Sequence, residues 1–327
     1  MPDFSLSSDR VDAVGSRLTR PECVLCTRAG DLFVSNWQGG VTRLTPEGRE
    51  IDILGHRPGQ PPVGTNGFAI DARGRFLLAD LHGEGGGVWR LHRDGLLEPF
   101  LLEIDGHPLP PANFVGVDRQ GRTWITVSTW RQPRHEAYRP DWADGFIVLV
   151  DERGARLAAE GLAYTNEAIV HPSGDWLYVN ETFGRRTSRM RILPNGDLGP
   201  RETVCTYGAG TFPDGLAFDA EGGFWMTSVV SNRLIRVDAE GTQRLILEDC
   251  DPEALAMVEE AFQAGALGRE HLDSLPEGRL GSISSIAFGG PDLRTAYLGN
   301  LLDRRIYRFT APVAGAPPAH WDITFPD

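Results

Sequence analysis

The chain has 327 residues, of which 41% are hydrophobic and 24% are charged, so it has the composition of a folded globular protein and not that of a disordered one. Its formal net charge of −13 excludes the basic surface with which proteins bind nucleic acid or anionic membranes, so a small-molecule substrate is the expected partner. Residues 1–20 lack the apolar run of a signal peptide, and no stretch has a membrane-spanning length, so a cytoplasmic location is expected. The oligomeric state is left open.

A short sequence unit recurs along the chain at a period of roughly 40–50 residues, which is typical of propeller blades. The unit is an apolar strand, a turn with Asp and Gly, a second apolar strand and a third strand before a charged turn. The copies lie at residues 25–34, 69–79, 116–125, 169–178, 217–226 and 287–298. These six copies predict an all-β, six-bladed β-propeller that forms a single domain over residues 1–327.

A third strand is predicted after each pair, because period-2 alternation continues between Gly, Asp and Pro residues. These candidates lie at 40–44, 87–91, 145–150, 189–193, 233–237 and 305–309. Closure of the ring is left open, since either the N-terminal segment or residues 320–325 could complete the last blade.

Helical sequence is confined to an insertion between the fifth and sixth blades. Asp251 can cap a helix whose first residue is Pro252. Leu255, Val258 and Phe262 then form an apolar stripe that is expected to pack the helix against the body of the protein.

One position is polar in all six repeats. Five residues before the turn position of each repeat stand, in chain order, Glu22, Asn66, Asn113, Asn166, Asp214 and Ser284. This position is predicted to lie just before the innermost strand, so the six side chains should converge on the mouth of the central channel. A single such residue often only satisfies a turn, but convergent oxygens with two carboxylates predict a site for a hard cation. Ca²⁺ is expected first, because the ring offers none of the histidine or thiolate ligands that Zn²⁺ prefers. Zn²⁺, Mn²⁺ and Mg²⁺ are the alternatives.

A second series of mostly polar residues ends the second strands at the same face. Its members are Asn36, Asp80, Val127, Asn180, Ser228 and Asn300. We interpret them as supports of the site, as residues that face the substrate, or as solvated loop residues, and we add the adjacent His82 and Glu181 as candidate substrate contacts.

Two insertions, at about 130–142 and about 249–280, interrupt the repeat. Links between blades and links from the second to the third strand emerge at the face of the polar ring, so both insertions are expected to lie over the site. The first carries Arg131, Arg134 and Arg139, which either pair with local acids or bind a substrate that has a carboxylate or several hydroxyls.

The cysteine pair Cys23 and Cys26 has a C-x-x-C spacing, but no second pair follows at zinc-ribbon distance. In an extended strand these two side chains point to opposite faces, so buried free thiols are expected.

The stretch 212–219 contains Pro213, Asp214, Gly215 and Asp219 and resembles the P-D-G-x-x-x-D motif of the family of regucalcin, gluconolactonases and luciferin-regenerating enzymes. Segments 165–167 and 297–300 extend the resemblance, which covers about residues 22–309.

The resemblance implies a six-bladed propeller with a divalent metal bound by Glu22, Asn166 and Asp214. It also implies that Asn113 contacts the substrate and that Asp214 acts as the general base. The sequence departs from gluconolactonase-type members at Pro111, where those proteins have an arginine, so the resemblance does not predict an aldonolactone as substrate.

These observations predict a metal-dependent hydrolase of a small lactone or ester. The cation would polarise the carbonyl as a Lewis acid, Asp214 would deprotonate a water, and Asn66 and Ser284 would join Asn113 around the substrate. No G-x-S-x-G nucleophile elbow is present. The alternatives are a non-catalytic ligand-binding propeller and a metal-dependent isomerase, cyclase or phosphotriesterase on the same scaffold.

Overall fold

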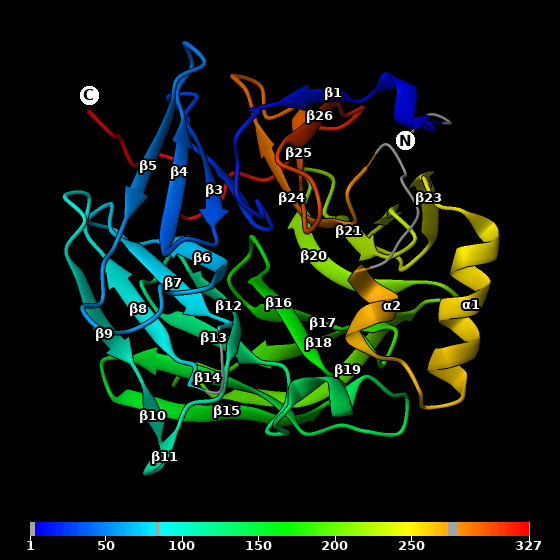
Figure 1. Cartoon of the computed structure of the whole chain (residues 1–327), viewed down its shortest axis with the longest axis horizontal. Helices are drawn as coiled ribbons and strands as arrows, with labels where there is room; N and C mark the ends of the chain where they lie inside the picture. Colours follow the sequence, from blue (N-terminus) through cyan, green and yellow to red (C-terminus); the bar gives the residue numbers. More distant parts are fainter. Residues whose placement is uncertain (1–3, 83–84, 274–279, 327) are drawn as a thin grey trace.

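The computed structural model describes residues 4–82, 85–273 and 280–326. Within them, six four-stranded antiparallel sheets follow one another around a central axis (Figure 1). The fold is the six-bladed β-propeller that the repeat predicts.

The strands of the first three blades are given from the axis outwards. Blade one contains β2 (Val24–Cys26), β3 (Leu32–Asn36), β4 (Gly40–Leu44) and β5 (Glu50–Leu54). Blade two contains β6 (Thr65–Ile70), β7 (Phe76–Asp80), β8 (Val88–Leu91) and β9 (Leu97–Leu101). Blade three contains β12 (Ala112–Val117), β13 (Thr123–Val127), β14 (Gly145–Asp151) and β15 (Gly154–Leu162).

The last three blades follow the same plan. Blade four contains β16 (Thr165–Val170), β17 (Trp176–Glu181), β18 (Arg186–Ile192) and β19 (Leu198–Thr206). Blade five contains β20 (Phe212–Phe218), β21 (Phe224–Val229), β22 (Arg233–Val237) and β23 (Gln243–Leu247). Blade six contains β24 (Ile283–Gly289), β25 (Thr295–Asn300), β26 (Ile306–Thr310) and the N-terminal β1 (Asp12–Val14). The short elements outside the blades are η1 (Ser8–Arg10), the hairpin of β10 (Glu103–Ile104) and β11 (His107–Pro108), and η2 (Arg134–Ala137).

The outermost strands of blades one to five are absent from the sequence prediction, which gave three strands per blade and left the completion of the last blade open. These strands are less buried than the inner ones: β5 and β9 have only intermediate and exposed positions, and β19 is mostly exposed. An outer strand has one face on the blade and one in water, so its sequence carries little of the apolar pattern that marks the inner strands.

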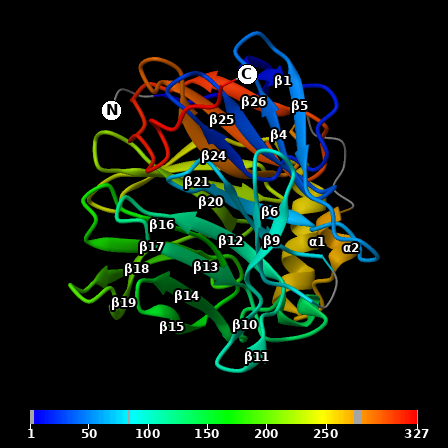
Figure 2. The same cartoon turned by 90° about the vertical axis from the view of Figure 1, so that its left-hand side faces the viewer.

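The N-terminal segment closes the ring. β1 pairs antiparallel with β26, with Asp12 opposite Arg308 and Val14 opposite Ile306, and the two strands lie side by side in both views (Figures 1 and 2). The C-terminal segment instead packs against the first two blades, where the Phe325 ring lies 4.4 Å from the Phe33 ring. Of the two alternatives left open by the sequence, the N-terminal one is correct.

The aspartate of the repeated turn ties that turn to the blade. Asp118 accepts hydrogen bonds from the backbone N–H groups of Gln120 and Arg122, while its second oxygen accepts one from Trp124 Nε1 at 3.0 Å. Trp124 is buried in the core between blades three and four. In this copy of the turn, one carboxylate satisfies both turn backbone and a buried indole, and Asp219 does the same with Trp225.

Five of the six ring residues lie within the first residues of the inner strands and not just before them, and the strands bulge at these residues. In blades two to six the pairing of the innermost with the second strand shifts register across Asn66, Asn113, Asn166, Asp214 and Ser284. A bulge releases a residue from the ladder and re-aims its side chain, so this irregularity accompanies the ring in every blade where it is seen.

The described parts of both insertions share one apolar cluster with residues near the inner strands. As predicted, Asp251 caps α1 (Pro252–Gln263) by accepting hydrogen bonds from the N–H groups of Glu253 and Ala254. α1 and α2 (Arg269–Asp273) lie side by side (Figures 1 and 2). A single apolar cluster contains Tyr138 of the first insertion, Val258 and Phe262 of α1, and Tyr164 and Phe212, which precede or begin the inner strands of blades four and five.

The expected free thiols are present. Cys23 and Cys26 are both free and buried, and they belong to different apolar clusters. Among the described residues, no helix has the length and apolar character needed to cross a membrane.

Close approach of neighbouring inner strands requires glycine beside two of the ring residues. A Cβ on Gly67 would lie 2.5 Å from Phe114 Cδ2 and 2.8 Å from Phe114 Cα, and a Cβ on Gly215 would lie 2.5 Å from the Ser284 carbonyl oxygen. Backbone atoms cannot yield as a flexible side chain can, so these glycines set the spacing of the blades at the axis.

We expect Gly67→Ala to lower the free energy of unfolding by about 1–3 kcal/mol, because the added methyl group overpacks the contact with Phe114. Gly208→Ala is the control, since a Cβ there meets no atom within 4 Å, and it should change stability by less than about 0.5 kcal/mol. Urea unfolding of both variants measures the difference, and equal stabilities would contradict the close approach.

Candidate active site

All six ring residues lie at the axial ends of the blades and are buried, with exposed fractions of 5% or less. The set comprises Glu22, Asn66, Asn113, Asn166, Asp214 and Ser284. Their hydrogen bonds distinguish residues that have an oxygen without a hydrogen-bond partner from residues that orient their neighbours.

Asn66 positions Glu22. Its Nδ2 donates to Glu22 Oε1 at 3.0 Å and to the Asn113 carbonyl oxygen at 2.9 Å, while its Oδ1 accepts from Arg20 Nη1 at 2.8 Å. Both ends of the amide are therefore engaged. The second carboxylate oxygen of Glu22, Oε2, is buried and has no hydrogen-bond partner in the described structure.

The orientation of Asn166 is set by the threonine behind it. Thr182 Oγ1 donates to the carbonyl oxygen of Pro213 at 2.8 Å, so it can only accept from Asn166, whose Nδ2 lies 3.0 Å away. This arrangement turns Asn166 Oδ1 away from Thr182, and Oδ1 is buried without a hydrogen-bond partner among the described residues. An unsatisfied buried oxygen costs free energy, which indicates a missing ligand.

Asp214 is held through its backbone. Asn180 Nδ2 donates to the carbonyl oxygens of Asp214 and Gly215 at 2.9 and 3.2 Å, and Thr187 Oγ1 fixes the other end of the Asn180 amide. Asn180 belongs to the second polar series. Its hydrogen bonds to the Asp214 and Gly215 backbone make it a support of the candidate site, and its complete burial excludes a solvated loop position.

The carboxylates of the ring destabilise one another. Burial raises the pKa of Glu22 to about 7, although Arg20 and Arg134 lower it. Burial and the Glu22 carboxylate raise the pKa of Asp214 well above its ordinary value. Glu167, which sequence reasoning did not single out, is a third buried acid whose pKa is raised well above the ordinary value by burial and by Glu22.

The donor set suits a hard divalent cation. Glu22 Oε2, Asn166 Oδ1 and the Asp214 carboxylate are oxygen donors, and the first two lack protein partners. In the described part of the chain, no three His, Cys, Asp or Glu side chains group as metal ligands, so the candidate set contains an amide besides its two carboxylates. A cation here would also lower the pKa values that burial raises.

Ser284 and Asn113 contact other parts of the ring. Ser284 Oγ donates to the carbonyl oxygen of Glu22 at 2.8 Å, which joins the last blade to the first beside the candidate ligand. Asn113 Nδ2 donates to Ser128 Oγ at 3.2 Å. Ser284 therefore supports Glu22 through the backbone.

Glu181 and His82 lie outside the ring. Glu181 forms an ion pair with Arg186, accepts hydrogen bonds from Ser188 Oγ and the Ala163 N–H, and is fully engaged in its own blade. Burial raises the pKa of Glu181, but the hydrogen bonds from Arg186, Ala163 and Ser188 lower it by more, so the pKa lies below its ordinary value. The His82 ring stacks on Trp37, with ring centroids 6.0 Å apart.

The arginines of the first insertion have different environments. Arg131 lies over the Trp142 ring at 3.5 Å and pairs with Glu136 at 3.3 Å, and Arg139 pairs with Asp141. Arg134 instead donates from Nε to Tyr164 Oη at 2.9 Å. Of the three, only Arg134 lies close enough to Glu22 and Asp214 to lower the pKa values of both.

Two further residues beside the ring were missed. Arg20 and Tyr164 stand two residues before Glu22 and Asn166, and both have left-handed backbone conformations, with φ of 50° and 66°. Such conformations cost about 1–3 kcal/mol and concentrate at functional sites. This is also the spacing at which the family resemblance places an arginine before Asn113, so the signal that could have identified Arg20 was a comparison of that position across blades.

Comparisons with known proteins identify the family of the chain. A family model described as SMP-30/Gluconolactonase/LRE-like region matches residues 21–248. The chain belongs to this family. A 6-deoxy-6-sulfogluconolactonase of Pseudomonas putida is 26% identical over 271 residues, which cover 82% of this chain and 77% of that protein.

Solved structures of family members share the fold. The calcium-binding protein regucalcin of Agrobacterium tumefaciens superposes with a TM-score of 0.68 at 16% identity, covering 96% of this chain and 97% of that one. A gluconolactonase of Xanthomonas campestris superposes with a TM-score of 0.67 at 18% identity, covering 92% and 89%. At these identities the likeness shows the fold alone.

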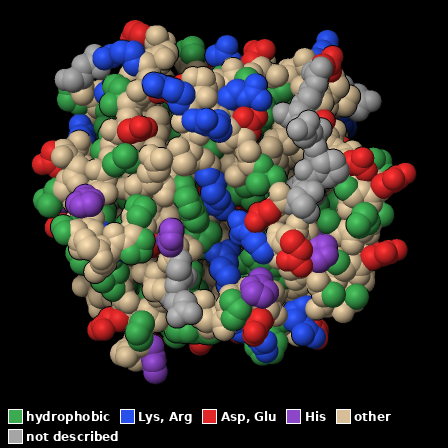
Figure 3. Space-filling model, viewed as in Figure 1, with side chains coloured by type: hydrophobic (Ala, Val, Ile, Leu, Met, Phe, Trp, Pro, Cys, Tyr) green, Lys and Arg blue, Asp and Glu red, His purple; other side chains and the backbone are tan. Residues whose placement is uncertain are grey.

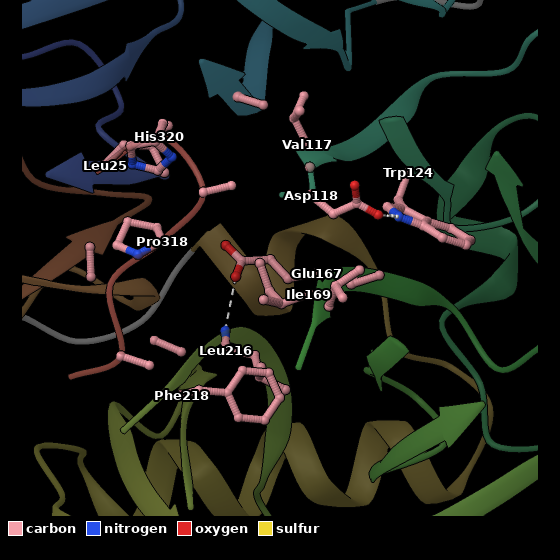
Figure 4. Close-up of a pocket in the computed structure, with 18 of the residues that line it drawn as sticks. Leu25, Val117, Asp118, Trp124, Glu167, Ile169, Leu216, Phe218, Pro318 and His320 are labelled. Atoms are coloured by element: carbon pink, nitrogen blue, oxygen red, sulfur yellow. Dashed lines mark hydrogen bonds between the residues drawn. The ribbon is translucent and has the colours of Figure 1, made fainter. Parts of the chain in front are cut away.

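A separate cavity lies on the turn side of the inner strands. It has a volume of about 180 Å³ and is lined by these strands and by residues 316–320 of the C-terminal segment (Figure 4). Its lining includes Glu167, whose Oε2 accepts a hydrogen bond from the Leu216 N–H at 2.8 Å, but none of the six ring residues. The cavity is therefore distinct from the candidate site at the polar ring.

We expect Asp214→Asn to raise the free energy of unfolding of the metal-free protein at pH 8 by about 1–3 kcal/mol, the cost of an uncompensated buried polar group. The raised pKa of Asp214 means that the native state ionises it less readily than the unfolded state, so its charge opposes folding at this pH. Urea unfolding in the presence of a chelator measures the change.

Asp219→Asn is the matched control, because Asp219 is buried with its partner Arg236 at 2.7 Å and also accepts from Trp225 Nε1. Losing one member of a buried ion pair should cost up to about 3–5 kcal/mol. If Asp214→Asn were as destabilising as Asp219→Asn, the protein itself would balance the Asp214 charge.

Proposed function

We propose that the protein is a hydrolase of a small lactone or ester that uses one divalent cation, with Ca²⁺ as the first choice and Zn²⁺, Mn²⁺ or Mg²⁺ as alternatives. The observation that carries the proposal is the pair of unpartnered buried oxygens, Glu22 Oε2 and Asn166 Oδ1, beside the buried Asp214. The names of the relatives support it: two are lactonases, and a third is a calcium-binding protein.

In the proposed site, Glu22, Asn166 and Asp214 hold the cation. When bound, the cation supplies Lewis acidity, which polarises a carbonyl and acidifies a water. Asn66 keeps Glu22 oriented through its hydrogen bond to Oε1, and Thr182 keeps the Asn166 oxygen toward the axis. The chain contributes a ligand set whose orientation is fixed before the substrate arrives.

Asp214 is the proposed general base. Its carboxylate takes a proton from water as the water oxygen bonds to the carbonyl carbon, and it returns that proton to the ring oxygen when the acyl C–O bond breaks. The product is the hydroxy acid, so atoms and charges balance. Proton transfer of this kind contributes about 10²–10⁴ to the rate.

The two insertions are proposed to cover the site. Tyr138 and Phe262 join both insertions to Tyr164 and Phe212, which stand two residues before Asn166 and Asp214. A cover at this position excludes bulk water and strengthens the electrostatic interactions beneath it.

We expect Glu22→Gln, Asn166→Ala and Asp214→Asn each to weaken Ca²⁺ binding at least tenfold, since each removes an oxygen ligand or its charge. Isothermal titration calorimetry on chelator-stripped protein measures the affinity. Glu202→Gln, on the exposed outer strand β19, is the control and should bind Ca²⁺ like the parent. Unchanged affinity in the Asp214→Asn protein would show that the cation does not bind at the axis.

Lactone hydrolysis should depend on the same residues. Chelation should abolish turnover of a panel of lactones and aryl esters, and added Ca²⁺ or one of the alternative cations should restore it. Asp214→Asn should lower kcat by about 10²–10⁴ even at saturating cation. Turnover that survives chelation in full would contradict a metal-dependent reaction.

A further inference from the structure

The charge around the proposed site does not balance once a cation is bound. The cation would neutralise Glu22 and Asp214, the two carboxylates among its ligands. Arg20 donates to Asn66, which holds Glu22, and Arg134 donates to Tyr164, which stands two residues before Asn166. The three arginines Arg20, Arg134 and Arg269, here called the arginine cluster, would then carry positive charge that the ring acids no longer offset.

Two members of the arginine cluster are held by neutral groups. Arg20 donates to Asn66 Oδ1 and lies 4.3 Å over the Trp37 ring. Arg134 donates to Tyr164 Oη, and its guanidinium lies 5.6 Å from the centre of that ring. In the residues that the structure describes, neither forms an ion pair with a carboxylate, in contrast to Arg131 and Arg139 of the same insertion.

The third member approaches from the second insertion. Arg269 is on α2, pairs with Asp273 at 2.7 Å and is partly exposed. Leu272 of the same helix packs against the apolar cluster that contains Tyr138 and Tyr164, so α2 lies beside the partner of Arg134. The Tyr138 and Tyr164 rings meet edge-on at 5.2 Å, so two phenols separate the guanidinium groups without neutralising them.

The arginine cluster is accessible to a ligand. Arg20 and Arg134 are only partly buried, although the ring residues beneath them are buried. Figure 3 shows basic side chains gathered around a hollow near the middle of the molecule. The sequence contains no lysine, so apart from histidine every basic side chain is a guanidinium, whose planar fork matches two oxygens of an anion.

We propose that the arginine cluster binds an oxyanion of the substrate, a sulfonate, phosphate or carboxylate that lies away from the scissile carbonyl. The proposal rests on the proposed lactone hydrolysis, which it narrows to anionic lactones. Arg20 and Arg134 carry like charges without a carboxylate partner among the described residues, and an anion relieves their repulsion whereas a neutral hydroxyl does not. Arg20 stands in blade one at the position that Pro111 occupies in blade three. The arginine that the family resemblance expects beside the substrate is therefore supplied by a different blade.

The test compares kcat/KM on glucono-δ-lactone with that on its relatives carrying a phosphate, a sulfonate or a carboxylate at position 6. The cation-loaded parent should act at least tenfold better on one of the anionic lactones, and the three anionic substrates identify the oxyanion. Arg134→Gln and Arg269→Gln should each lower the ratio of anionic to neutral kcat/KM at least tenfold, through KM. Arg269 is partly exposed on α2, so that variant should fold even if Arg134→Gln does not.

Arg139→Gln is the matched control, because Arg139 lies in the same insertion as Arg134 but pairs with Asp141, and it should leave the ratio unchanged. A second readout needs no turnover: inorganic sulfate should raise the unfolding temperature of the parent and of Arg139→Gln more than chloride does at equal ionic strength, and it should lose this effect in Arg134→Gln. Sulfate that acts equally on all three proteins overturns the proposal.

The outcomes separate the two proposals. Hydrolysis of neutral and anionic lactones with equal kcat/KM, unaffected by Arg134→Gln and Arg269→Gln, overturns the anion site and leaves lactone hydrolysis standing. Sulfate stabilisation that requires Arg134, without turnover of any lactone, supports the anion site and overturns lactone hydrolysis.

Discussion

Two carboxylates buried together on the axis are the constraint on which the structure of the site depends. Glu22 and Asp214 are each less than 5% exposed, and burial raises the pKa of both. Ionised acids in such surroundings need a compensating charge. Asn66, Thr182 and Asn180 orient these acids and Asn166 without neutralising them, which explains why the protein keeps oxygen atoms unpartnered at its centre.

Sequence periodicity predicted most of the fold because each blade repeats a local pattern. The turn aspartate, the apolar inner strands and the capped helix at Asp251 are all encoded within a few residues of one another. The outer strands and the closure of the ring were not predictable in this way. β1 pairs with β26 across almost the whole chain, and nothing in residues 12–14 identifies that distant partner. A family model that matches residues 21–248 is consistent with the repeat but stops before the blade that closes the ring.

The register of the repeat identified where the candidate site residues lie. It did not predict which of them keep an unpartnered oxygen and which only hold other residues in place. Asn66 and Asn166 have the same residue type at the same register, yet one amide is saturated and the other keeps a free oxygen. Only their neighbours, Arg20 and Thr182, make that difference. Arg269 was missed for a related reason: it lies in an insertion outside the repeat, where no register applies.

The hydrogen bond from Ser284 to the Glu22 backbone has a consequence for biosynthesis. Glu22 leaves the ribosome early, whereas the serine that fixes its main chain belongs to the sixth and last blade. A nascent chain therefore contains all three proposed ligands long before their geometry is complete. Affinity for the proposed cation should therefore appear late, when the sixth blade closes the ring. A cation bound at the axis would then stabilise the complete protein and not truncated products.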